Sequence, residues 1–190
     1  MPALYTTTWD VTPSISDIDL APLGRRLTIG LNRSFLLYPD TTYNCTMDQR
    51  LFDEYADQLR KTRYLFTLEG RPWGIPIAML GANGWNIDLT QGIYSGYTVS
   101  YFSLQLAIYM GFVEVVYLGL DLQHSEGKTH FFGADFHSRD HEQTEFPKMT
   151  RMMEQGAARA EAMGVKVYNC SPVSNLRGFR RISFEDAIAL

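Results

Sequence analysis

All four histidines of this 190-residue chain lie between residues 121 and 141, interspersed with acidic side chains. The histidines are His124, His130, His137 and His141, and the acids are Asp121, Asp135 and Asp140. An imidazole has an unperturbed pKa of about 6.5, so it can take up or release a proton at neutral pH. A histidine of this segment is therefore a candidate general base, and Asp121 is a second candidate catalytic group.

Other interpretations of these residues stay open. His137 and His141 are four residues apart, which suits two metal ligands on one side of a helix. The His-Glu-x-x-His pattern of many zinc sites does not occur, however. Histidines of exposed loops often interact only with solvent. Asp121 can equally cap a helix or a turn, and Asn32 can equally satisfy loop backbone.

The same segment also contains glycines and hydroxyl residues, which argue against a place in the core. Gly127 and Gly133 allow bends, and Ser125, Thr129 and Ser138 add polar side chains. A long segment of this composition is typical of a functional loop. We therefore expect residues 121–145 to form an active-site loop or lid.

The stretch from Gly92 to Leu122 predicts the elements that position these groups. Ser95 and Thr98 are candidate caps for a helix with an apolar stripe at Val99, Phe102, Leu106 and Met110, and with Ser100 and Gln105 off that stripe. Gly111 ends this helix, and the apolar run 113–118 predicts a strand covered on both faces. Asp121 then follows the carboxyl end of the strand, the edge at which open α/β sheets bind ligands.

The rest of the chain alternates between predicted strands and helices. Strands are expected at 4–9, 27–32, 43–48, 64–68, 76–80 and 165–170, with Asn32 at the tip of the second. Helices or short turns of helix are expected at 17–23, 49–61 and 145–163, with a short closing element at 182–189. This alternation predicts an α/β fold: a single Rossmann-like domain over residues 1–190, with a mainly parallel sheet flanked by helices.

Composition limits the class of protein. A net charge of −4 and a pI near 5.5 argue against general nucleic-acid binding, which needs a basic surface. Cys45 and Cys170 are the two cysteines, so no disulfide framework is expected. With no apolar run long enough to cross a bilayer and no signal peptide, we expect a cytoplasmic protein without a membrane span.

Several segments occur in the same order in a known group of proteins. They are Ile93–Gly96, Leu104–Phe112, the strand up to Asp121, Gly127–Phe131 and Val165–Pro172. On these segments the chain resembles the 6-hydroxymethylpterin diphosphokinase-like family, also known as domain of unknown function 115. That family is related in fold to the bacterial sialyltransferases of glycosyltransferase family 42. The resemblance runs from about Pro13 onward and is strongest between Gly92 and Asp121.

The resemblance implies that a nucleotide-linked donor binds over the strand tips. Asn32 matches an asparagine that faces the nucleotide, and the turn Tyr94-Ser95-Gly96 matches a Thr-Ser-Gly turn that contacts the donor. His137 matches the catalytic histidine, and His130 matches a second histidine of the family. Ser14 of the first loop and Ser171 after the last long strand complete the donor-binding set that the resemblance implies.

The chain departs from the family in its first loop. Where the family usually reads Gly-Asn-Gly-Pro-Ser, this chain reads Asp-Val-Thr-Pro-Ser over residues 10–14. The loss of both glycines restricts the close approach of backbone to phosphate, and Asp10 repels an anion. Gly92 also stands where the sialyltransferases carry an arginine. These changes favour a donor other than a sialyl nucleotide, or binding without turnover.

Three functions follow as hypotheses. The first is a glycosyltransferase that moves a sugar from a nucleotide-sugar donor, such as a CMP-linked one, to a glycan or another hydroxyl acceptor. The second is an ATP-dependent diphosphokinase-like enzyme, whose Mg²⁺ would need carboxylates such as Asp48 and Asp121. The third is a non-catalytic nucleotide-binding protein. Each of the three is compatible with a homo-oligomer.

Overall fold

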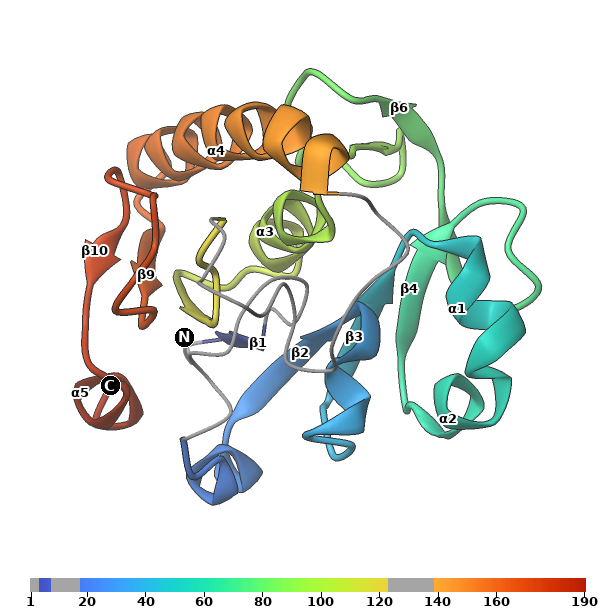
Figure 1. The fold of residues 1–190 in the computed structure, drawn as a ribbon, viewed down its shortest axis with the longest axis horizontal. Helices are drawn as coiled ribbons and strands as arrows, with labels where there is room; N and C mark the ends of the chain where they lie inside the picture. Colours follow the sequence, from blue (N-terminus) through green and yellow to red (C-terminus); the bar gives the residue numbers. More distant parts are fainter. Residues whose placement is uncertain (1–3, 8–17, 123–138) are drawn as a thin grey trace.

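The computed structural model describes residues 4–7, 18–122 and 139–190. These residues form an α/β fold in which helices pack against an eight-stranded sheet, and every strand pair in that sheet is parallel (Figure 1). A separate pair of parallel strands lies beside it. The predicted Rossmann-like class, with a parallel sheet flanked by helices, is therefore confirmed.

The strand order of the main sheet is β10-β9-β8-β1-β2-β3-β4-β5. Its strands are β1 Leu4–Thr7, β2 Leu27–Leu31, β3 Tyr43–Thr46, β4 Leu65–Leu68, β5 Ile75–Ile77, β8 Glu114–Leu118, β9 Lys166–Asn169 and β10 Arg180–Arg181. The small sheet consists of β6 Met79–Gly81 and β7 Ile93–Tyr94. The chain builds outward from β1 to β5 and then returns to the other side of β1 with β8. The order therefore reverses between β1 and β8, which is the point where doubly wound sheets bind ligands.

Helices cover both faces of the sheet. The α-helices are α1 Gln49–Glu54, α2 Ala56–Lys61, α3 Val99–Tyr109, α4 Arg139–Ala162 and α5 Phe184–Ile188, and the 3-10 turns are η2 Ala21–Arg25 and η3 Asn32–Leu36. On one face α3 lies against the strands and α4 lies across α3 (Figure 1). On the other face two smaller apolar clusters involve η2 with α5, and η3 with α1 and α2. A parallel sheet needs this double cover because both of its faces are apolar.

The burial of α3 corrects the predicted amphipathic pattern. Ser100 and Gln105 were expected off its apolar stripe, but Ser100 is 2% exposed and Gln105 is fully buried. The reason is that α3 is enclosed between the sheet and α4, so every side of it meets protein. Gln105 makes this tolerable because its amide nitrogen donates to the carbonyls of Tyr94 and Tyr101, at 2.8 and 3.0 Å.

Several predicted boundaries were wrong. Helix α4 begins at Arg139, so residues 139–145 are helical and not part of a loop. The predicted helix 49–61 is two helices that meet at Tyr55, and the predicted strand 76–80 is divided between β5 and β6. The predicted turn at 17–23 is a 3-10 turn that runs through Gly24 to Arg25. Two short strands, β7 and β10, were not predicted.

In the part of the chain that the structure describes, none of the helices is long and apolar enough to span a bilayer. The longest, α4, carries charged residues along its length, among them Arg151, Glu154 and Arg159.

Candidate functional site

Two predicted site residues lie at the same rim of the sheet. Asn32 follows the carboxyl end of β2, and Asp121 follows the carboxyl end of β8. Because β2 and β8 are the two parallel neighbours of β1, their tips are separated by roughly 10 Å, twice the usual spacing between strands. The two residues therefore flank the point at which the strand order reverses.

Asp121 and Ser171 are brought together in the structure. Asp121 is 1% exposed and Ser171 is 2% exposed, and the Ser171 hydroxyl donates a hydrogen bond to Oδ1 of Asp121. These residues come from the segments after β8 and β9, fifty positions apart. A buried carboxylate with a hydroxyl donating to it is held in one orientation.

Backbone contacts fix this pair in place. Asn169, at the end of β9, donates from its side chain to the Leu120 carbonyl at 2.9 Å and accepts from the Ser171 amide at 3.0 Å. The Asn175 amide donates to the Asp121 carbonyl at 3.0 Å. Arg181 of β10 donates to the carbonyls of Ser171 and Ser174. The loop after β9 is thus tied both to the loop after β8 and to the sheet edge.

Asn32 joins the tips of β2 and β3. Its side-chain oxygen accepts a hydrogen bond from the Thr46 hydroxyl at 3.1 Å. Its backbone φ is +48°, a left-handed conformation that asparagine adopts more readily than most residues. The side chain is therefore held at the rim, at the first residue of η3.

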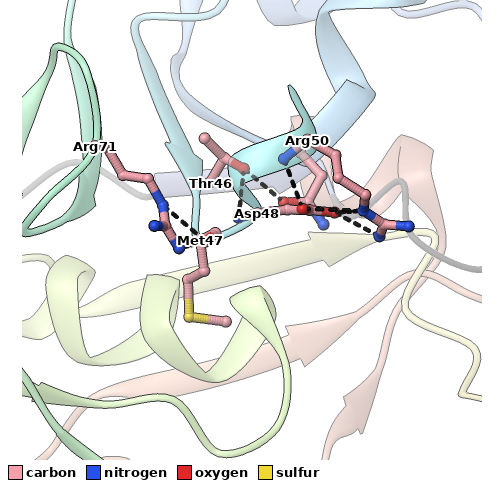
Figure 2. A network of polar contacts seen from close by, with 6 residues as sticks. Thr46, Met47, Asp48, Arg50 and Arg71 are labelled. Atoms are coloured by element: carbon pink, nitrogen blue, oxygen red, sulfur yellow. Dashed lines mark hydrogen bonds and ion pairs between the residues drawn. The ribbon is translucent and has the colours of Figure 1, made fainter. Parts of the chain in front are cut away.

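Next to Thr46 lies a network of charged groups, which Figure 2 shows. Asp48 caps α1 by accepting from the Arg50 amide at 2.9 Å, and the Arg50 guanidinium reaches its two carboxylate oxygens at 2.6 and 3.2 Å. Arg71, from the loop after β4, donates to the Met47 carbonyl at 2.7 Å. Burial raises the pKa of Asp48, but the hydrogen bonds from Arg50 and the charges of Arg50 and Arg33 outweigh this and hold the pKa below its usual value.

Three arginines and one aspartate therefore meet beside Asn32. Arg33 is 7% exposed, follows Asn32 in η3 and acts on Asp48 through its charge. Guanidinium groups are donors that suit an anion, because they form charge-assisted hydrogen bonds with it. Sequence reasoning missed Arg33, Arg50 and Arg71 because they come from three separate segments. The one available signal was that each follows a predicted strand closely.

The turn Tyr94-Ser95-Gly96 precedes α3. Gly96 has φ +56° and its neighbour Tyr97 has φ +65°. Ser95 forms hydrogen bonds with nearby backbone: its amide donates to the Gly81 carbonyl at 2.9 Å, and its hydroxyl accepts from the Tyr97 amide at 3.4 Å. Among the described residues, no hydrogen bond joins this turn to Asn32 or Asp121. Of the two candidate caps of α3, Thr98 is the one whose hydroxyl accepts from the Ser100 amide.

Backbone strain marks the same three places. Among the described residues, those other than glycine with positive φ are Asn32, Tyr97 and Leu122. Asn32 is itself a predicted site residue, Tyr97 follows Gly96, and Leu122 follows Asp121. Residues held in this conformation cost free energy and cluster at functional sites. This observation does not depend on the polar contacts described above.

Three of the predicted site residues, His130, His137 and Ser14, lie outside the described residues, as do His124, Asp135 and the first loop at 10–14. Within the described residues no three His, Cys, Asp or Glu side chains gather as metal ligands. Tyr94 is half-buried, and its ring covers Gly84, where an added Cβ would lie 2.3 Å from it. This Tyr94 contact is one of packing.

No protein-family model, no curated protein and no solved structure matches this chain. The resemblance to the diphosphokinase-like family and to the sialyltransferases stays a prediction from the sequence.

Proposed function

We propose that the protein is a transferase that binds a nucleotide-sugar donor across the carboxyl rim of its sheet and passes the sugar to a hydroxyl acceptor. The observation that carries this proposal is the placement of strained backbone. The three non-glycine residues with positive φ in the described chain lie at Asn32, beside Gly96 and beside Asp121. Strain at three of the predicted site segments is expected if the fold maintains them for a ligand.

The charges at the rim fit an anionic donor. Arg33, Arg50 and Arg71 lie around Asp48 and Met47, so a phosphate group bound there would gain charge-assisted hydrogen bonds from guanidinium groups. Asn32, at the tip of β2, has the amide group that can contact a base or ribose. On the other side of the reversal point, Asp121 and Ser171 form a buried polar pair for the transferred group or the acceptor.

The chemistry we propose uses His137 as the general base. His137 would take the proton from the acceptor hydroxyl, whose oxygen attacks the anomeric carbon of the sugar. The bond between that carbon and the nucleotide phosphate oxygen breaks, and the nucleotide leaves as a phosphate anion beside the arginines. His130 is the alternative base, and Asp121 would help to orient the acceptor.

A magnesium-dependent diphosphokinase is the second candidate, and the described contacts favour it less. It would use Asp48 and Asp121 as metal ligands. Asp48 already binds Arg50 through two oxygens, and Asp121 already accepts from Ser171. A cation would have to compete with both partners.

The test is a binding screen with CMP, UDP, GDP, ATP and their sugar conjugates, with and without Mg²⁺. A ligand that binds the native state raises the melting temperature by mass action. We expect a metal-independent rise with at least one nucleotide sugar. Asn32→Ala or Ser171→Ala should weaken the binding of that ligand up to about tenfold, as expected for one lost hydrogen bond. Thr90→Ala, in an exposed loop, is the control and should bind normally.

The outcomes separate the three hypotheses. A rise with ATP that requires Mg²⁺ would support the diphosphokinase. Normal binding together with a sugar-transfer activity that survives in both His137→Ala and His130→Ala would contradict the proposed base. Normal binding with no transfer to any tested acceptor would favour the non-catalytic binder. No thermal response to any nucleotide would contradict the proposal as a whole.

A further inference from the structure

A pocket of about 400 Å³ opens at the end of the sheet opposite to the candidate site. Leu65 is the first residue of β4 and Ile75 is the first residue of β5, so the pocket lies at the amino ends of these strands. The end of α2 forms its other side, next to β4 (Figure 1). The pocket is therefore separate from the rim that holds Asn32 and Asp121.

Two arginines of this pocket stack on aromatic rings. The guanidinium carbon of Arg60 lies 3.9 Å from the ring centroid of Trp73, and that of Arg63 lies 5.3 Å from that of Tyr64. Within the described part of the chain, neither guanidinium forms an ion pair with a carboxylate. A guanidinium stacked on a ring keeps its in-plane N–H groups available, and the ring holds the plane in one orientation.

A third donor in the pocket is also unused. The indole nitrogen of Trp73 is buried and has no hydrogen-bond partner within the described residues. Buried donors are almost always paired in folded proteins, so an unpaired one needs an explanation. The pocket lining contains no aspartate or glutamate. Its polar side chains thus offer donors and positive charge without a matching acceptor.

Most of the remaining lining is apolar, and the Thr62 hydroxyl donates to the Leu59 carbonyl at 2.7 Å. Tyr64 is 41% exposed and Ile75 is 43% exposed, and Leu65 closes the floor. Large apolar side chains at the surface next to unpaired cations fit a ligand with an anionic end and an apolar body. From this arrangement we propose that the pocket binds a small aromatic oxyanion. Its phosphate or carboxylate would lie between Arg60 and Arg63, and its ring would lie against Tyr64 and Ile75.

Phenyl phosphate is the probe that tests this proposal. The chain has three tryptophans, so three indole N–H signals are expected in a ¹⁵N-correlated NMR spectrum, and Trp73→Phe assigns one of them. Phenyl phosphate should shift the Trp73 signal saturably and leave the other two in place. Arg60→Gln and Arg63→Gln should each weaken the affinity about tenfold, as expected for a lost charge-assisted contact.

The control variants and ligands test separately the contribution of the charge, the contribution of the ring and the location of the binding site. Arg151→Gln removes an exposed arginine of α4 and should leave the affinity unchanged, as should Thr90→Ala in an exposed loop. Inorganic phosphate and phenol each lack one half of the ligand and should bind more weakly than phenyl phosphate. Benzoate distinguishes a carboxylate ligand from a phosphate ligand.

Three results would overturn the proposal. One is the absence of a saturable shift of the Trp73 signal with both phenyl phosphate and benzoate. Another is a shift that phenol reproduces equally well. The third is an affinity that neither Arg60→Gln nor Arg63→Gln reduces. If oligothymidylate binds more strongly than phenyl phosphate, as measured by the same Trp73 signal, the ligand of this pocket is a nucleic-acid strand and not a small molecule.

Discussion

Asp48 links the stability of the rim to pH. Its pKa is depressed in the folded protein, so its contribution to stability is fully present above the unfolded-state value and is lost as the pH falls through the folded value. We expect Asp48→Asn, which can still cap α1, to lower the free energy of unfolding at pH 7 by about 1 kcal/mol, because the pair with Arg50 is partly exposed.

Denaturant unfolding at a series of pH values checks this. The difference between wild type and Asp48→Asn should shrink as the pH falls below the ordinary pKa of an aspartate and disappear once Asp48 is protonated in the folded state. Asp57→Asn, an exposed carboxylate of α2, is the control and should cost less at pH 7. A difference that is constant with pH would mean that the Asp48 charge does not stabilise the protein.

An added Cβ atom would clash with a neighbouring side chain at Gly96 but not at Gly70. Both have positive φ, +56° and +82°. A Cβ at Gly96 would lie 2.3 Å from the Tyr101 ring, whereas a Cβ at Gly70 would meet nothing within 4 Å. Gly70→Ala should therefore cost the backbone strain alone, about 1 kcal/mol, and Gly96→Ala should cost more than about 2 kcal/mol. Equal costs in thermal unfolding would show that Tyr101 can move away.

At the scale of elements, two hydroxyl residues before α3 have different expected roles: Thr98 in the stability of the helix and Ser95 in ligand binding. The Thr98 hydroxyl caps the helix, while the Ser95 hydroxyl has one long contact with the Tyr97 amide. Thr98→Ala should lower the free energy of unfolding by about 1 kcal/mol, and Ser95→Ala should lower it by less. If the donor contacts Ser95, the Ser95→Ala variant should bind the donor more weakly although the stability of this variant is nearly normal. Greater destabilisation by Ser95→Ala would contradict this assignment of the cap.

The sequence was sufficient to predict the elements whose pattern is local. The strands around 27–31, 114–118 and 166–169 lie in short, mainly apolar stretches that a polar residue ends or follows within three positions, and the helices between them carry clear caps or glycine stops. The two-residue strands β7 and β10 could not be found because two residues show no periodicity. The interruption at Ala78, between β5 and β6, could not be predicted. An apolar run does not show which of the two sheets each half of the run joins.

The candidate site was predictable one residue at a time, but its contacts were not. Asn32 and Asp121 stand at strand tips, which the apolar patterns place without a structure. That Asp121 meets Ser171 depends on β8 and β9 being neighbours, and no local pattern determines strand order. The arginines around Asp48 were missed for the same reason.

At the scale of the molecule, the reactivity of the Cys45 thiol can be used to measure whether the whole sheet is folded. It is fully buried in β3, and burial raises the pKa of its thiol well above the usual value. Burial also raises the pKa of Cys170, to about 12. In a Cys170→Ser variant the remaining thiol should react with a thiol reagent only when the protein opens globally. Its labelling should accelerate with denaturant as global unfolding does, and rapid labelling in native buffer would show that β3 opens locally.

The position of β1 has a consequence for how the protein folds. Leu4 pairs with Leu27 on one side and with Val115 on the other, so β1 connects the two halves of the sheet. During synthesis β1 leaves the ribosome long before β8, and its second edge must wait for that partner. Pairings between residues so distant in sequence form slowly because the loop between them must first close. The joining of β1 to β8 is then the step at which a nascent chain is most exposed to wrong strand partners.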